Sequence, residues 1–156
     1  MIAETRSAAE TRALGAALAA QLQGNDVLLL LGDLGAGKSE LTRGIARGLG
    51  ITDYITSPTF TILQVHEGGR LPLYHFDWYR LSCADELYEL NLDEYLHMDG
   101  VSAVEWPFRA PEAIPESYLQ VEIEPLDDDT RRFTFTPVGG FRELLPIQTE
   151  GTNNER

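Results

Sequence analysis

Residues 32–39 read Gly-Asp-Leu-Gly-Ala-Gly-Lys-Ser and match the phosphate-binding loop pattern G-x4-G-K-[S/T]. In this pattern the glycines let the backbone curl around a β-phosphate. The lysine, Lys38, brings a positive charge to the β and γ oxygens, and the Ser39 hydroxyl helps to hold Mg²⁺. Lys38 is the only lysine among the 156 residues. The motif therefore predicts binding of a nucleoside triphosphate.

The flanking sequence favours this interpretation over a glycine-rich turn that only links a strand to a helix. The apolar run 27–31 has the length of a buried parallel strand, and residues 38–49 have helical spacing that stops at Gly50. Strand, glycine loop and helix thus follow one another in the order that phosphate binding needs. We predict an α/β fold, a P-loop NTPase-like three-layer domain with a central mixed sheet flanked by helices.

The other elements are predicted from apolar periodicity and turn residues. Helices are expected over 7–22, 82–90 and 93–96. Strands are expected over 61–66, 71–77, 101–105, 118–124 and 131–136. Ser7, Ser82 and Asp93 have the side chains of helix N-caps. Gly68-Gly69 predicts a hairpin between the first two of these strands, and the turn at 127–129 predicts another between the last two.

Length and composition fit a single domain. We expect residues 1–146 to form one P-loop ATPase domain and residues 147–156 to form a flexible tail. One cysteine, Cys83, cannot build an internal disulfide framework or a multi-cysteine metal site, which favours a reducing compartment. The N-terminus lacks the apolar core of a signal peptide, and no run is long enough to span a membrane. A cytoplasmic location is therefore expected.

The chain is strongly acidic, with a formal net charge of -13. Such a charge opposes direct binding to a nucleic acid, since that affinity depends chiefly on neutralising phosphates. A basic protein partner is easier to accommodate. The segment from Leu81 to Phe108 holds seven acidic residues and neither arginine nor lysine. This segment is either a solvated acidic face or a docking surface.

Two predicted strands end in a carboxylate. Asp77 closes the apolar run 73–76, and Glu105 closes the run 101–104. Because the carboxyl ends of parallel strands meet at the ligand crevice of an open sheet, both acids could face one bound Mg²⁺-nucleotide. The alternative for each is an ordinary helix cap or turn residue.

Hydroxyl and aromatic side chains add to this predicted site. Ser57, Thr59 and Thr61 follow the first crossover helix, where nucleotide hydrolases carry their switch segments, although Ser-Pro-Thr is also common in turns. Trp106 follows Glu105 and could lie against an adenine ring or be a core or rim tryptophan. Three histidines show no metal-ligand spacing and are assigned structural roles: His66, His75 and His97.

Taken together, these motifs resemble the bacterial TsaE family of ATPases, formerly called YjeE. After the phosphate loop, the resemblance rests on four segments, Ser57–Thr61, Tyr74–Arg80, Asp99-Gly100 and Glu105–Pro107. The loop alone would fit many families, whereas the four later motifs together are specific. The resemblance implies an ATPase required for threonylcarbamoylation of adenosine-37 in tRNAs that read codons starting with A. It also implies binding to the TsaB–TsaD pair, whose catalytic cycle ATP hydrolysis keeps turning over, and contact with tRNA only through these partners.

The resemblance further implies ATP and Mg²⁺ as cofactors. The implied triphosphate ligands are Leu34, Gly35, Ala36, Gly37, Lys38 and Ser39, with Trp106 near the nucleotide. The implied metal ligands are Ser39, Asp77 and Glu105. The catalytic candidates are Lys38, Asp77, Glu105 and, in the switch role that Thr61 could also take, Thr59.

The sequence departs from the family pattern at two places. Glu40 follows Ser39 where the family usually has a second threonine, and we expect its side chain to point away from the nucleotide. Trp78 replaces a leucine, which bears on packing. No glutamine is placed like the water-positioning residue of Ras, because Gln64 falls within a predicted strand, so hydrolysis is expected to be weak alone and controlled by partners. A small-molecule kinase, which would need an arginine-rich lid, and a non-catalytic ATP-dependent binding module remain as alternatives.

Overall fold

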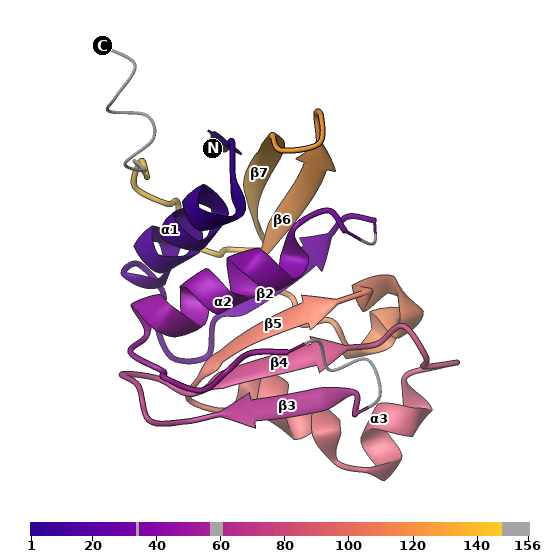
Figure 1. The fold of residues 1–156 in the computed structure, drawn as a ribbon. Helices are drawn as coiled ribbons and strands as arrows, with labels where there is room; N and C mark the ends of the chain where they lie inside the picture. Colours follow the sequence, from indigo (N-terminus) through magenta and orange to yellow (C-terminus); the bar gives the residue numbers. More distant parts are fainter. Residues whose placement is uncertain (34, 57–60, 148–156) are drawn as a thin grey trace.

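The computed structural model of the chain describes residues 1–33, 35–56 and 61–147. Within these residues, seven strands form one mixed sheet in the order β1-β7-β6-β2-β5-β4-β3 (Figure 1). The strands are β1 (Ile2–Thr5), β2 (Val27–Leu31), β3 (Leu63–His66), β4 (Leu73–Asp77), β5 (Val101–Glu105), β6 (Tyr118–Pro125) and β7 (Arg131–Val138). The α-helices are α1 (Ala8–Ala19), α2 (Lys38–Gly48) and α3 (Asp85–Glu89). Short 3-10 helices are η1 (Leu92–His97), η2 (Pro107–Arg109) and η3 (Pro111–Ala113).

The central strands of the sheet are parallel. Strand β2 pairs with β5 and β6, and β5 pairs with β4, all in parallel register. The edges are antiparallel, through the hairpins β3–β4 and β6–β7 and the pairing of β1 with β7. The carboxyl ends of β2, β4 and β5 therefore lie together along one side of the sheet, at the ends of these strands. The phosphate loop follows β2 there.

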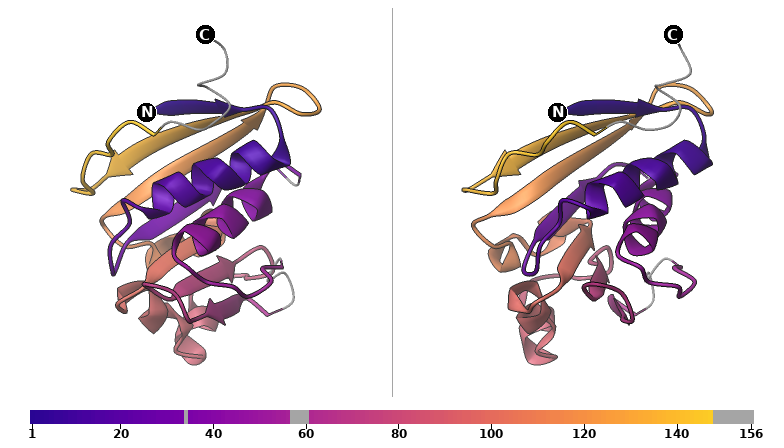
Figure 2. Two further views of the ribbon diagram at one scale, coloured as in Figure 1. Left: turned by 60° about the vertical axis from the view of Figure 1, so that its left-hand side comes forward. Right: turned by 90° about the vertical axis from the view of Figure 1, so that its left-hand side faces the viewer.

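The sheet separates two apolar layers. Leu28 and Leu30 of β2 belong to the cluster under α1 and α2, whereas Val27 and Leu29 belong to the cluster covered by α3 and η1. This alternation follows from the two-residue period of a strand. Helices α1 and α2 lie side by side over one face (Figure 2). The predicted three-layer α/β fold with a mixed central sheet is confirmed.

Several elements differ from the predictions. Asp93 lies inside η1 after the N-cap Asn91 and so does not cap it, and the strands expected from residues 61 and 71 begin at Leu63 and Leu73. Strand β1 was not predicted, because four residues are too few to show a period; pairing with β7 stabilises it. Helix α3 begins after Ala84, while the Ser82 amide donates to the Glu86 carboxylate, so Ser82 does not cap the helix. Ile147, which the predicted tail included, packs against the core, and residues 148–156 lie outside the described range. In the described part of the chain, no helix is long and apolar enough to cross a membrane.

Glycines allow α1 and α2 to touch along their backbones. A Cβ atom added to Gly44 would lie 2.1 Å from the carbonyl oxygen of Arg12, and one added to Gly15 would lie 2.4 Å from that of Leu41. Neither distance leaves room for a methyl group. Since α2 begins directly after the phosphate loop, this contact helps to fix the position of the loop relative to the strand ends.

We expect the substitution Gly44→Ala to lower the free energy of unfolding by about 1–3 kcal/mol, because overpacking outweighs the better helix propensity of alanine. Urea denaturation measures this change. Arg47→Ala, an exposed substitution in the same helix, is the control and should shift stability by less than about 0.5 kcal/mol. A Gly44→Ala protein as stable as the wild type would show that the close helix contact is dispensable.

Candidate nucleotide site

The phosphate loop has the backbone shape that its glycines predict. Gly35 and Gly37 adopt φ angles of 78° and 116°, in the left-handed region that disfavours other residues. Gly37 caps α2, whose first turn presents backbone N–H groups without partners inside the helix. The Ala36 amide donates to the carbonyl of Asp33 at 3.0 Å and closes the loop. The N–H groups at the start of α2 and the helix dipole favour an anion in front of the loop.

The two predicted carboxylates lie next to each other. Asp77 of β4 and Glu105 of β5 are register partners at the ends of neighbouring parallel strands, and both are buried. They lie on the face of the sheet that α2 covers, since Leu73 and Ala103, at even spacing from them, contribute to that cluster. Both acids thus lie at the same ends of neighbouring parallel strands, while their facing one bound Mg²⁺-nucleotide stays a prediction.

A histidine for which the sequence predicts a structural role lies beside these two carboxylates. His75 is fully buried, and its Nε2 lies 2.7 Å from Oε2 of Glu105. Because a carboxylate only accepts hydrogen bonds, Nε2 carries the proton and donates. His75 thereby orients Glu105. Its position two residues before Asp77 in a strand, hence on the same face, was the available sequence signal.

Lys38 joins the loop to these acids. Its side chain is buried, and its Nζ lies 3.9 Å from Oε1 of Glu105. Burial is the largest influence on its pKa and lowers it below the usual value, because a low dielectric disfavours the charged form. The carboxylates of Glu105, Asp77 and Asp33, in that order, act in the opposite direction. The ammonium is thus held in a pocket of negative charge at the sheet edge.

Trp106 covers the other side of the lysine. The Lys38 Nζ lies 4.4 Å from the ring centroid, a cation–π contact. Trp106 has a φ angle of 56°, unusual for a bulky residue, and Pro107 follows it at the start of η2. Its ring packs edge to face with Tyr79 at 5.0 Å. A bulky residue held in this conformation marks a position fixed by its surroundings.

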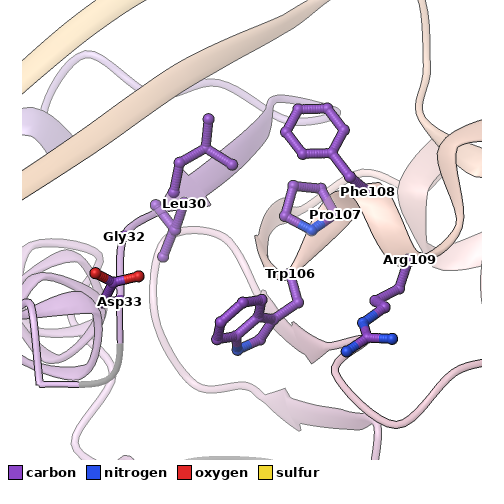
Figure 3. A pocket seen from close by; sticks show the side chains of 8 residues that line it. Leu30, Gly32, Asp33, Trp106, Pro107, Phe108 and Arg109 are labelled. Carbon is purple, nitrogen blue, oxygen red and sulfur yellow. The ribbon is translucent and has the colours of Figure 1, made fainter.

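A cavity of about 340 Å³ lies between the start of the phosphate loop and the segment that follows β5. Figure 3 shows the Trp106 indole extending towards the side of Asp33, whereas the Arg109 side chain extends downward in this view. The Arg109 guanidinium lies 5.2 Å from the Tyr79 ring. Trp106 therefore lines the cavity at the start of the loop and also contacts the Lys38 amine. The adenine contact considered for it stays a prediction.

The turn role considered for Asp77 is present as well. Its Oδ1 accepts the backbone N–H of Tyr79 at 2.9 Å. This bond shapes the exit from β4, and Asp77 remains the register partner of Glu105 at the end of the neighbouring strand.

Both departures from the family pattern are accommodated. Glu40 pairs with Arg12 of α1 and with Arg43 of α2, each at 2.6 Å, so two guanidiniums neutralise the acid beside the loop. Trp78 is fully buried and packs edge to face with Phe76 at 5.8 Å. The larger ring is therefore part of the core, although its Nε1 has no hydrogen-bond partner among the described atoms.

The remaining predicted residues are placed only in part. Leu34, Ser57 and Thr59 lie outside the described residues. Thr61 is exposed just before β3, and Ser39 is half-buried in the first turn of α2. Among the described residues, no three His, Cys, Asp or Glu side chains form a metal cluster. Two neighbouring carboxylates and a hydroxyl nevertheless fit Mg²⁺, which is usually held by one or two carboxylates together with phosphate oxygens and water.

Together, the order of strand, loop and helix and the crevice at the parallel strand ends define a protein of the α/β, P-loop NTPase-like class. Comparison with known proteins narrows the class. The family model described as "Threonylcarbamoyl adenosine biosynthesis protein TsaE" matches residues 5–133. The chain belongs to the TsaE family, which confirms the resemblance seen in its motifs.

Individual relatives agree with this assignment. The chain is 49% identical over 136 residues to the tRNA threonylcarbamoyladenosine biosynthesis protein TsaE of Bacillus subtilis, covering 87% of this chain and 85% of the relative. It is 38% identical over 130 residues to the protein of the same name from Treponema pallidum, covering 83% and 96%. The crystal structure of YdiB from Bacillus subtilis superposes with a TM-score of 0.77 at 44% identity, covering 89% and 86% of the two chains.

The lowered pKa of Lys38 has a measurable effect on stability. Between its pKa in the folded protein and the unfolded value of 10.5, the unfolded chain binds more protons, so the free energy of unfolding rises with pH. We expect this rise in the wild type and a smaller one in Lys38→Met, measured by urea denaturation between about pH 8 and about pH 10. Tyrosines titrate in both proteins and cancel in the difference. Equal pH slopes would contradict the buried ammonium.

Proposed function

We propose that this chain is a Mg²⁺-dependent ATPase subunit required for formation of threonylcarbamoyladenosine at position 37 of tRNAs that read codons starting with A. In this proposal it acts with the TsaB and TsaD proteins and meets tRNA only through them. The observation that carries the ATPase part is the Lys38 ammonium 3.9 Å from Glu105 at the mouth of a phosphate loop. The tRNA part rests on membership of the TsaE family.

Each part of the site has a task in this proposal. The amides of Gly35 and Gly37 and the start of α2 would cradle the phosphates, and Lys38 would contact the β and γ oxygens. Ser39, Asp77 and Glu105 would hold Mg²⁺. The chemistry that Mg²⁺ would supply there is neutralisation of negative charge on the phosphates. His75 keeps the Glu105 carboxylate in its orientation through the bond at 2.7 Å.

The position of Trp106 beside Lys38 indicates a role for this residue. In phosphate loops the lysine amine contacts the β and γ oxygens, and the indole lies 4.4 Å from that amine. In our proposal Trp106 therefore lies near the phosphates and shields them from water on the side of the cavity.

Control by partners is supported by the residues near the switch segment. Gln64 lies in β3, where its amide donates to the Thr56 hydroxyl at 3.3 Å. A glutamine engaged in a strand is not placed to orient an attacking water. A group supplied by a partner would complete the site and give weak hydrolysis in its absence.

Glu105 is the sharpest test of the metal assignment. Glu105→Gln should lower the rate of Mg²⁺-dependent hydrolysis by about 10²-fold or more, because one charged ligand at the reacting phosphate is lost. Binding of ATP without Mg²⁺ should change far less. The exposed substitution Glu143→Gln is the control and should leave both unchanged. Normal hydrolysis by Glu105→Gln would reduce Glu105 to a structural partner of His75.

Phosphate release, measured for the chain alone and with purified TsaB and TsaD, tests the whole proposal. We expect slow release alone and a clear stimulation by the pair, with Lys38→Ala inactive in both mixtures. Transfer of phosphate to a small molecule would instead indicate a kinase. ATP binding without turnover in any mixture would indicate a nucleotide-dependent binding module.

A further inference from the structure

One side chain that is distant in the sequence contacts the phosphate loop. Arg131, the first residue of β7, donates from Nε to the carbonyl of Ala36 at 3.1 Å and from Nη2 to that of Gly35 at 3.5 Å. Its stem lies under the loop, since a Cβ built on Gly37 would be 4.0 Å from the Arg131 Cγ. The guanidinium therefore contacts two successive peptide units of the loop.

The other end of the guanidinium is fixed to the β6–β7 turn. Nη1 of Arg131 donates to the carbonyls of Asp127, Asp128 and Thr130 at 2.8, 3.2 and 3.1 Å. The turn itself is closed by the Asp127 carboxylate, which accepts two backbone N–H groups. These two bonds, from Asp129 and Thr130, are the main reason that the pKa of Asp127 lies below its usual value. Arg131 thus connects the phosphate loop to the β6–β7 turn.

Peptide planarity turns this contact into control of the loop amides. In a trans peptide unit the C=O and the following N–H point in opposite directions. Holding the Ala36 carbonyl against the guanidinium therefore directs the Gly37 N–H away from it, to the opposite side of the loop. Gly37 needs such a restraint, because glycine has little intrinsic preference between the two orientations of the preceding peptide.

We propose that Arg131 is a positioning residue for the triphosphate, which holds the Ala36–Gly37 peptide so that the Gly37 amide faces the phosphates. The inference rests on the proposed function, because it assumes that the loop binds a nucleotide. Arg131 itself contacts carbonyl oxygens of the loop and so acts through the backbone. Its loss should weaken binding by loosening the loop, and leave the carboxylates at the sheet edge untouched.

The test compares Arg131→Gln with Arg132→Gln. Arg132 follows in the same strand but pairs with Glu4 of β1 at 3.0 Å, which makes it a matched control for the loss of a charge. We expect Arg131→Gln to raise Kd and KM for Mg²⁺-ATP by about tenfold, the scale of one lost charged hydrogen bond, with kcat much less affected. Arg132→Gln should bind as the wild type does. Equal affinities of wild type and Arg131→Gln, or equal losses in both variants, would overturn the proposal.

Chemical rescue separates positioning from a general loss of stability. Arg131→Ala with guanidinium chloride at a non-denaturing concentration should recover part of its ATP affinity, and sodium chloride at the same concentration should not. Failure of this rescue counts against the proposal. If the truncated variants do not fold, Arg131→Lys takes their place. It keeps the stem and charge but offers one donor group, and should bind between wild type and the expected loss; wild-type affinity would contradict the two-carbonyl contact.

Hydrogen exchange distinguishes failure of this inference from failure of the proposed function. Without nucleotide, the amides of residues 35–37 should exchange faster in Arg131→Gln than in the wild type and Arg132→Gln. Unchanged exchange would overturn the role of Arg131 even if the chain binds ATP. A wild-type chain that binds no ATP would instead overturn the proposed function, while faster exchange in Arg131→Gln would still support the contact itself.

Discussion

The burial of the Lys38 ammonium is the constraint around which the site is built. An isolated buried charge is costly, so it persists only beside opposite charge or a polarisable surface. Glu105 and Trp106 supply these two partners, and Glu105 is in turn held by His75. The start of α2 and the ends of β4 and β5 must therefore stay in register for the lysine to remain where it is.

This arrangement also explains why the acids can serve more than one purpose. Asp77 shapes the exit from its strand with one oxygen, and Glu105 takes part in two contacts, with Lys38 and with His75. Neither role excludes a metal, because a carboxylate has several lone pairs to offer. Before chemistry is considered, the same groups already stabilise the edge of the sheet that the nucleotide would occupy.

Much of the fold and part of the site followed from local pattern. The loop motif, the run 27–31 and the acids at two strand ends were sufficient to predict a phosphate loop facing two carboxylates. The short strand β1 was missed because its stability comes from pairing with β7 and not from its own residues. Arg131 left no sequence signal, since it meets the loop across a separation of 95 residues that only the strand order brings together. The role of His75 depended on its neighbour in another strand, which a single-strand pattern does not contain.

The described contacts also connect the phosphate loop back to itself through α2, α1, β1 and β7. Helix α2 leaves the phosphate loop and packs on α1 through glycines; α1 follows β1, β1 pairs with β7, and β7 brings Arg131 back to the loop. A buried contact between the Thr5 and Thr11 hydroxyls at 2.7 Å stiffens the corner between β1 and α1. The N-terminal strand consequently belongs to the set of contacts that supports the phosphate loop. The Met1 amine donates to the Phe135 carbonyl. An affinity tag fused ahead of Met1 would therefore disturb β1, the strand that pairs with β7. A tag at the other end suits measurements of this protein better.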